Sequence, residues 1–199
     1  HAIQPRAPRT TGRAAHSPNR PPQRPVVVSR AARAERPDPH GLAPRRAALH
    51  LVSAVLDDGR SLDAARAEPP VSRLDGPDRA RAGDLAEAVL RWLRPIDATL
   101  AGLMRKPLAP RARIARDALR LAVAETAILG TPPHAAVDAA VRLTRADRST
   151  VALSGLVNAV ARRATAMRPA LEPGAMLPDW LASALTQAWG GAVLPALTQ

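Results

Sequence analysis

The sequence predicts an all-α protein, and two observations lead to that prediction. Hydrophobic residues make up 46% of the 199 residues, but Ala supplies much of that share, and Phe and Tyr are absent. Ala and Leu are good helix formers, whereas strands favour β-branched and aromatic residues, so this composition favours helices. After residue 43, apolar residues also recur at the helical spacing of i, i+3, i+4 and i+7. The length allows one ordinary domain with tails, or two small domains.

Residues 1–43 form a Pro- and Arg-rich segment that we expect to be a disordered basic arm. Eight prolines interrupt every possible helix, and eight arginines stand against two acidic residues, which gives a net charge of +6. Such a composition cannot bury enough apolar surface to fold. The arm either adds nonspecific attraction to RNA or is a solvated extension without a dedicated role, and the sequence leaves both open.

We expect residues 44–168 to form one helical domain. Its first half contains three predicted helices. Pro44 can occupy the first turn of a helix that runs to about residue 57. After a loop with a short helical turn at residues 61–70, an acidic first turn near Asp75 begins the helix with the cleanest amphipathic pattern. Pro95 should end that helix, and a shorter one follows to about residue 104.

Three further helices are predicted over residues 111–129, 134–146 and 149–167. Glu125 continues the apolar side of the first, so it should lie either at the rim or in a pair with an arginine. Structural pairing is expected over catalysis, because no second acid or His accompanies it. His134 begins the second, where a solvated or capping role is expected because no second metal ligand stands at helical spacing. A short helix near Asp179 follows, and the chain then ends without an obvious finishing element.

We expect the helix at 149–167 to organise the bundle. Its apolar stripe consists of Leu153, Leu156, Val157, Val160 and Ala164. Small residues beside Asn158 would let a second helix approach closely. A buried unpaired amide costs about 1–3 kcal/mol, so Asn158 is expected to bond a neighbouring helix's backbone, with contact to a ligand as the alternative.

The net charge of +12 indicates a polyanionic partner, most naturally nucleic acid. Of the 29 basic residues 28 are Arg, which a GC-rich genome would also produce. The absence of Cys excludes disulfides, thiolate nucleophiles and Cys-ligated metals, and it fits a cytoplasmic location. No apolar run approaches the roughly 18 residues of a membrane span. No phosphate loop, dinucleotide fingerprint or zinc motif occurs, so we expect no catalytic residues, metal or cofactor in this chain.

Six short motifs follow one another in a characteristic order along residues 44–168. They are an arginine-led first helix, Asp78-Arg79, Val89-Leu90-Arg91, Leu119-Arg120-Leu121, Pro132-Pro133-His134-Ala135-Ala136-Val137 and Gly155-Leu156-Val157-Asn158-Ala159-Val160. Their order and spacing resemble the NusB-like helical domain. Ala124-Glu125 stands where that family usually has Tyr-Gln, and Asp138 where Asn is common, and both departures bear on local hydrogen bonding.

The resemblance implies one of two settings for this domain. Antitermination factors of the NusB type bind a short RNA element together with a ribosomal protein. In ribosomal RNA (cytosine-5) methyltransferases of the RsmB/Fmu/Sun type, the domain precedes a catalytic domain that uses S-adenosylmethionine. Residues 169–199 look like the connection to such a catalytic domain, so we expect the RNA-binding, targeting part of a methyltransferase, with ribosomal RNA as its partner.

The resemblance also implies which side chains contact RNA phosphates. Arg45 and Arg46, in the arginine-led first helix, are the first candidates, and the bland alternative is a solvated pair. Arg162 and Arg163 are the second candidates. Two other functions stay open, namely a stand-alone antitermination factor and a helical protein-interaction module whose arginines only solubilise it.

Overall fold

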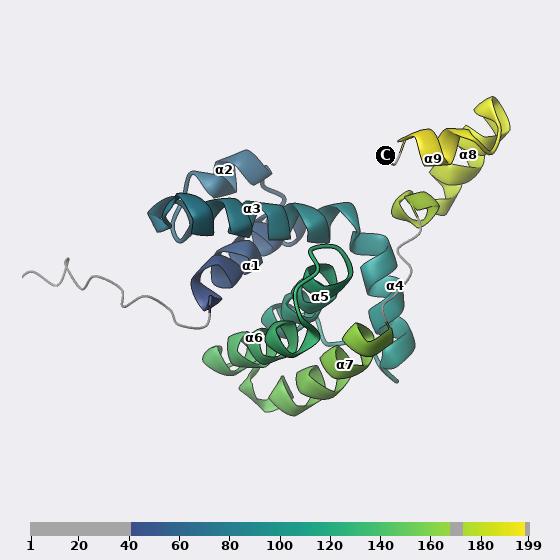
Figure 1. Cartoon of the computed structure of the whole chain (residues 1–199). Helices are drawn as coiled ribbons and strands as arrows, with labels where there is room; N and C mark the ends of the chain where they lie inside the picture. Colours follow the sequence, from purple (N-terminus) through teal and green to yellow (C-terminus); the bar gives the residue numbers. More distant parts are fainter. Residues whose placement is uncertain (1–40, 168–172, 198–199) are drawn as a thin grey trace, which may run out of the picture. The chain divides into compact units, whose positions relative to one another are not determined.

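A computed structural model describes residues 41–167 and 173–197 of the chain (Figure 1). Regular structure in these two ranges is helical and no strand occurs there, which confirms the predicted all-α class. The predicted arm lies outside the described residues except for its last three. Two of those, Leu42 and Ala43, already belong to the first helix, so this helix begins two residues earlier than predicted.

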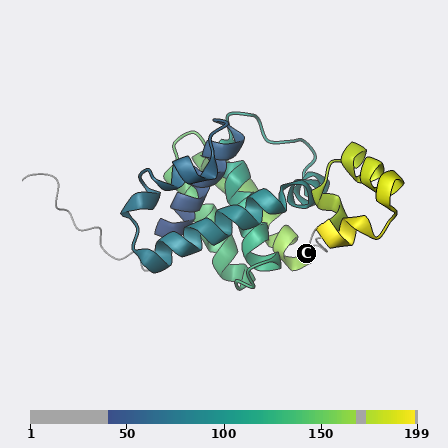
Figure 2. The same ribbon diagram turned by 90° about the horizontal axis from the view of Figure 1, so that it is seen from above.

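The helices agree closely with the predicted ones. In chain order they are α1 (Leu42–Leu56), α2 (Leu62–Arg66), α3 (Gly76–Arg91), α4 (Leu93–Leu103), α5 (Arg113–Ala127), α6 (Pro133–Ala146), α7 (Ser154–Met167), α8 (Asp179–Trp189) and α9 (Val193–Leu197). Short 3₁₀ turns lie at Val71–Arg73, Val151–Leu153 and Pro173–Met176. Helices α8 and α9 lie side by side in both views (Figures 1 and 2), and α9 was not expected from the sequence.

Local sequence sets the limits of α3 and α4. The Asp75 side chain accepts a hydrogen bond from the Asp78 N–H at 2.9 Å, which caps the acidic end of α3 as predicted. The break, however, comes at Trp92 and not at Pro95. Pro95 lies in the first turn of α4, where the N–H that proline lacks would have no helical partner in any case.

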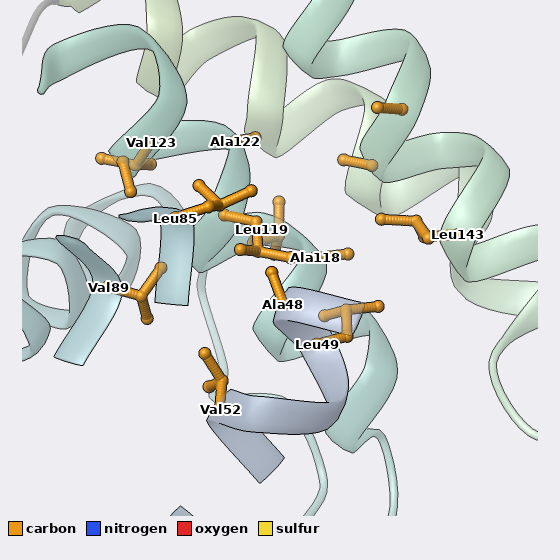
Figure 3. Packing of buried hydrophobic residues seen from close by; sticks show 14 of the residues in the cluster. Ala48, Leu49, Val52, Leu85, Val89, Ala118, Leu119, Ala122, Val123 and Leu143 are labelled. Atoms are coloured by element: carbon orange, nitrogen blue, oxygen red, sulfur yellow. The ribbon is translucent and has the colours of Figure 1, made fainter. Parts of the chain in front are cut away.

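Helix α5 is the centre of the bundle. It contacts α1, α3, α4, α6 and α7, and every residue from Asp117 to Glu125 is buried. Figure 3 shows Leu119 and Val123 of α5 among apolar side chains of α1 and α3. The expectation that the helix at 149–167 organises the bundle is therefore wrong, because that helix packs on one side only.

The C-terminal helix of the bundle, α7, buries most of its predicted apolar stripe, and Leu156 is the exception. Its buried residues are Val157, Val160, Ala161, Ala164 and Thr165, whereas Leu156 is 42% exposed. Asn158 is exposed as well, and no hydrogen bond of its side chain is found among the described residues. The expected buried contact between Asn158 and a neighbouring backbone is thus not formed.

Candidate nucleic-acid interface

Arg45 is held inside the bundle by a buried ion pair. Its Nε and Nη2 donate to the two carboxylate oxygens of Glu125 at 3.0 and 2.7 Å, and the Arg45 side chain is only 7% exposed. Nη1 donates to the Gly41 carbonyl at 2.9 Å. Gly41 has φ of 59°, and a Cβ there would come within 3.1 Å of Nη1, so glycine suits this position on both counts.

A second guanidinium completes this ion-pair cluster. Arg81 of α3 donates to Glu125 Oε1 at 3.0 Å, and its side chain is 45% exposed. The predicted pairing of Glu125 with an arginine is confirmed, and Glu125 has two such partners, Arg45 and Arg81. Because a fork-like pair with a buried carboxylate occupies the Arg45 guanidinium, its position is structural, and a phosphate contact by Arg45 has no support from this geometry.

Arg46, the next residue, has the opposite environment. It is exposed, and no ion pair or hydrogen bond of its side chain occurs in the part of the chain that the structure describes. It borders a surface hollow of about 550 Å³ between α1, α5 and the end of α6, where Leu143 and Asp147 also lie. Of the two arginines chosen first, Arg46 is therefore the one that can reach a ligand.

A second charged network lies on α5, two turns from Glu125. Arg120 donates to both oxygens of Asp97 at 2.8 and 2.7 Å and to Asp117 at 2.8 Å, and Ser53 donates to Asp117 at 3.1 Å. Burial raises the pKa of Asp117 despite the opposing charges of Arg120 and Arg116. Burial acts to lower the pKa of Arg120, but its bonds to Asp97 and Asp117 outweigh that effect and raise it.

A groove of about 600 Å³ runs between α6 and α7, and we call it the α6–α7 groove. Its lining residues are Pro133, His134, Val137, Asp138, Val141, Asn158, Arg162, Thr165 and Ala166. Two predicted residues, Asn158 and Arg162, meet there, because positions four apart on a helix share one face. No sequence signal linked His134 to them, since only the packing of α6 on α7 brings these residues together.

The two arginines at the end of α7 are both exposed. Arg162 has no ion pair among the described residues, and Arg163 makes one long contact of 3.5 Å to the Leu103 carbonyl. Helix α6 lies between the two sets of candidate arginines. Its last turn borders the hollow beside Arg46, and its first turns line the α6–α7 groove together with Arg162. Three of the four predicted arginines, Arg46, Arg162 and Arg163, thus remain available to a polyanion.

The described residues can also be compared with metal sites, membrane-spanning helices and acid–base pairs. They contain no group of three His, Cys, Asp or Glu side chains that could hold a metal ion. None of their helices combines the length and apolar character needed to cross a membrane. Both buried acidic clusters are satisfied by arginines, so neither resembles a poised acid–base pair.

Comparison with known proteins gives the same answer for fold and family. Proteins named ribosomal RNA small subunit methyltransferase B are similar to this chain: one from Xanthomonas campestris is 39% identical over 153 residues, and one from Xylella fastidiosa strain Temecula1 is 34% identical over 151. Each alignment covers 75% of this chain, and the chain spans about a third of each relative's length, 34% and 35%. The NusB family model matches residues 42–166, which is the greater part of the chain and nearly the range predicted from its motifs. The chain therefore belongs to the NusB family.

Proposed function

We propose that this chain is the RNA-targeting domain of a ribosomal RNA methyltransferase. It would hold ribosomal RNA so that a separate catalytic domain, with S-adenosylmethionine as methyl donor, can reach a cytosine. The observation that carries this proposal is the similarity to proteins named ribosomal RNA small subunit methyltransferase B, of which this chain spans about a third. The net charge of +12 supports a polyanionic partner.

The side chains that we assign to RNA are Arg46, Arg162 and Arg163. Exposed guanidiniums without carboxylate partners bind phosphate oxygens well, because their planar fork matches the phosphate geometry. Each such contact displaces counterions from the RNA, and each contributes about 0.7 to 0.9 to the slope of log affinity against log salt. Arg45 is excluded from this set because its charge is already compensated by Glu125.

The adjacent pair Arg45 and Arg46 gives the test of this assignment. We expect Arg46→Ala to lower the salt slope of binding to a ribosomal RNA fragment by about 0.7 to 0.9, with stability changed by no more than about 0.5 kcal/mol. Arg45→Met should lower stability by about 3 kcal/mol, because it leaves a buried carboxylate with one partner fewer, and should leave the slope unchanged. Fluorescence anisotropy over a salt series and urea unfolding measure the two effects.

A triple variant decides whether the assignment holds. If Arg46→Ala, Arg162→Ala and Arg163→Ala together leave affinity and salt slope as in the parent chain, these arginines do not contact RNA. A stand-alone antitermination factor would bind RNA together with a ribosomal protein, so RNA binding that an added ribosomal protein strengthens favours that alternative, and binding that it leaves unchanged favours the targeting domain. A protein-interaction module would keep its partner in a pull-down after ribonuclease treatment.

A further inference from the structure

We propose that the α6–α7 groove binds unpaired adenine nucleotides of single-stranded RNA, with Asn158 reading the edge of a base. This inference rests on the proposed function and adds a base-specific site to it. Phosphate contacts position a protein on RNA without distinguishing bases, so a site of this kind would supply sequence preference.

The shape and lining of the groove suit a base. Its walls are mainly apolar, with Val137 and Val141 on α6 and Ala166 on α7, and its volume of about 600 Å³ lies in the ordinary range for ligand sites. Unpaired bases present flat apolar faces and polar edges, and proteins bind them by covering the faces and hydrogen-bonding the edges. In the α6–α7 groove the aliphatic walls can cover the faces of a base, and the polar lining residues can hydrogen-bond its edges.

Asn158 supplies the group that an edge requires. Its amide carries two donors and an acceptor, it lines the groove, and none of these atoms bonds to another described residue. An asparagine amide can donate to one edge atom of adenine and accept from its exocyclic amine, which is the pairing that favours adenine over other bases. The amide is exposed beside the apolar walls of the groove and forms no side-chain hydrogen bond to another described residue, so its donors and acceptor are available to a ligand.

The charge around the groove favours a nucleotide chain. Residues 133–167 contain five arginines and two aspartates, and both aspartates are engaged locally, Asp138 with Arg142 at 2.7 Å and Asp147 with the Ser149 N–H at 2.9 Å. Arg162 lies one helical turn from Asn158 on the same lining face, where it can contact the phosphate next to a bound base. Of the charged residues that line the groove, Asp138 is paired with Arg142, whereas Arg162 has no carboxylate partner among the described residues, so the lining keeps one uncompensated positive charge.

Nuclear magnetic resonance gives a direct test, because the whole chain contains only two asparagines, Asn19 and Asn158. Protein labelled with ¹⁵N-asparagine shows two side-chain amide pairs, and Asn158→Ala identifies which belongs to Asn158. Single-stranded oligomers of A, C, G and U are titrated in turn. We expect the Asn158 amide to shift in a saturable way, with tightest binding to the A oligomer.

Variants separate base recognition from charge. Asn158→Ala should weaken binding of the A oligomer about fivefold or more and remove the preference among the four oligomers, with the salt slope unchanged because the amide is neutral. Arg162→Ala should weaken all four alike and lower the slope. Gln187→Ala, which removes an exposed amide on α8 outside the groove, is the control and should change neither.

The outcomes distinguish this inference from the proposed function. Salt-dependent RNA binding with no base preference, an unmoved Asn158 amide and an unaffected Asn158→Ala variant overturns the inference and leaves the targeting function standing. Saturable shifts with an acidic helical peptide but not with RNA overturn it in favour of a protein occupant. Absence of salt-dependent binding to ribosomal RNA and to all four oligomers overturns both.

Discussion

Helices α5 and α7 lie against each other in the bundle, but several polar side chains are buried on α5, whereas several are exposed on α7. On α5, Asp117, Arg120 and Glu125 are buried, and each is held by partners of opposite charge. On α7, Asn158, Arg162 and Arg163 are exposed, and their side chains form no ion pair within the described residues. A charge enters the core only when a partner compensates it, so the uncompensated polar groups mark the face available to a ligand.

The largest expected effect comes from breaking the Glu125 cluster. Glu125→Ala should destabilise the protein by about 3–5 kcal/mol, because it leaves the Arg45 guanidinium buried without a carboxylate. Arg81→Ala removes the half-exposed partner of the same carboxylate and should cost no more than about 1 kcal/mol. Urea unfolding measures both, and equal losses would show that the Arg45–Glu125 pair adds nothing to stability beyond the Arg81–Glu125 pair.

A second comparison lies within α7 and should give a smaller effect. Val157 is fully buried and the larger Leu156 is 42% exposed. Val157→Ala should cost about 2 kcal/mol through lost burial and the cavity left behind, whereas Leu156→Ala should change stability by no more than about 0.5 kcal/mol. Thermal unfolding of both variants measures this. A larger loss at Leu156 would mean that Leu156, and not Val157, is the stripe residue that packs most closely against the bundle.

The smallest expected effect is a pH dependence at Asp117. Burial raises the pKa of Asp117 in the folded chain, so this carboxyl binds protons more readily when folded than when unfolded. Its contribution to stability is therefore fully present below the ordinary aspartate pKa and is lost as pH rises through the raised value.

The measurement follows the parent chain and Asp117→Asn through urea unfolding between about pH 7 and about pH 4, the window above the ordinary aspartate pKa in which a raised pKa falls. We expect the parent to gain stability relative to Asp117→Asn as pH falls. A relative loss over the same window would mean that the bonds from Arg120 and Ser53 hold the folded pKa of Asp117 below its ordinary value.

Local patterns in the sequence predicted most of the helices. Asp75 and Pro133 marked boundaries, because capping and the missing proline N–H act within a few residues, whereas Pro95 lies within the first turn of α4. The pairing of Glu125 with arginine was also predictable, since a carboxylate on an apolar face must be compensated. The phosphate contact assigned to Arg45 finds no support in the structure, because Arg45 is the residue that compensates Glu125. Nothing in the local sequence indicated that Arg45, and not Arg46, was this partner.

By itself, therefore, the sequence determined the all-α class, the order of the helices, the NusB-like motifs and the basic character of the chain, because periodicity, caps and charge are read from neighbouring residues. Only the tertiary structure decided that α5 is central, that Arg45 is buried while Arg46 is exposed, and that Asn158 and Arg162 share a groove with His134. These facts depend on how helices far apart in the chain pack, and neighbouring residues such as Arg45 and Arg46 point about 100° apart around a helix axis, so the orientation of the helix decides which of them is buried.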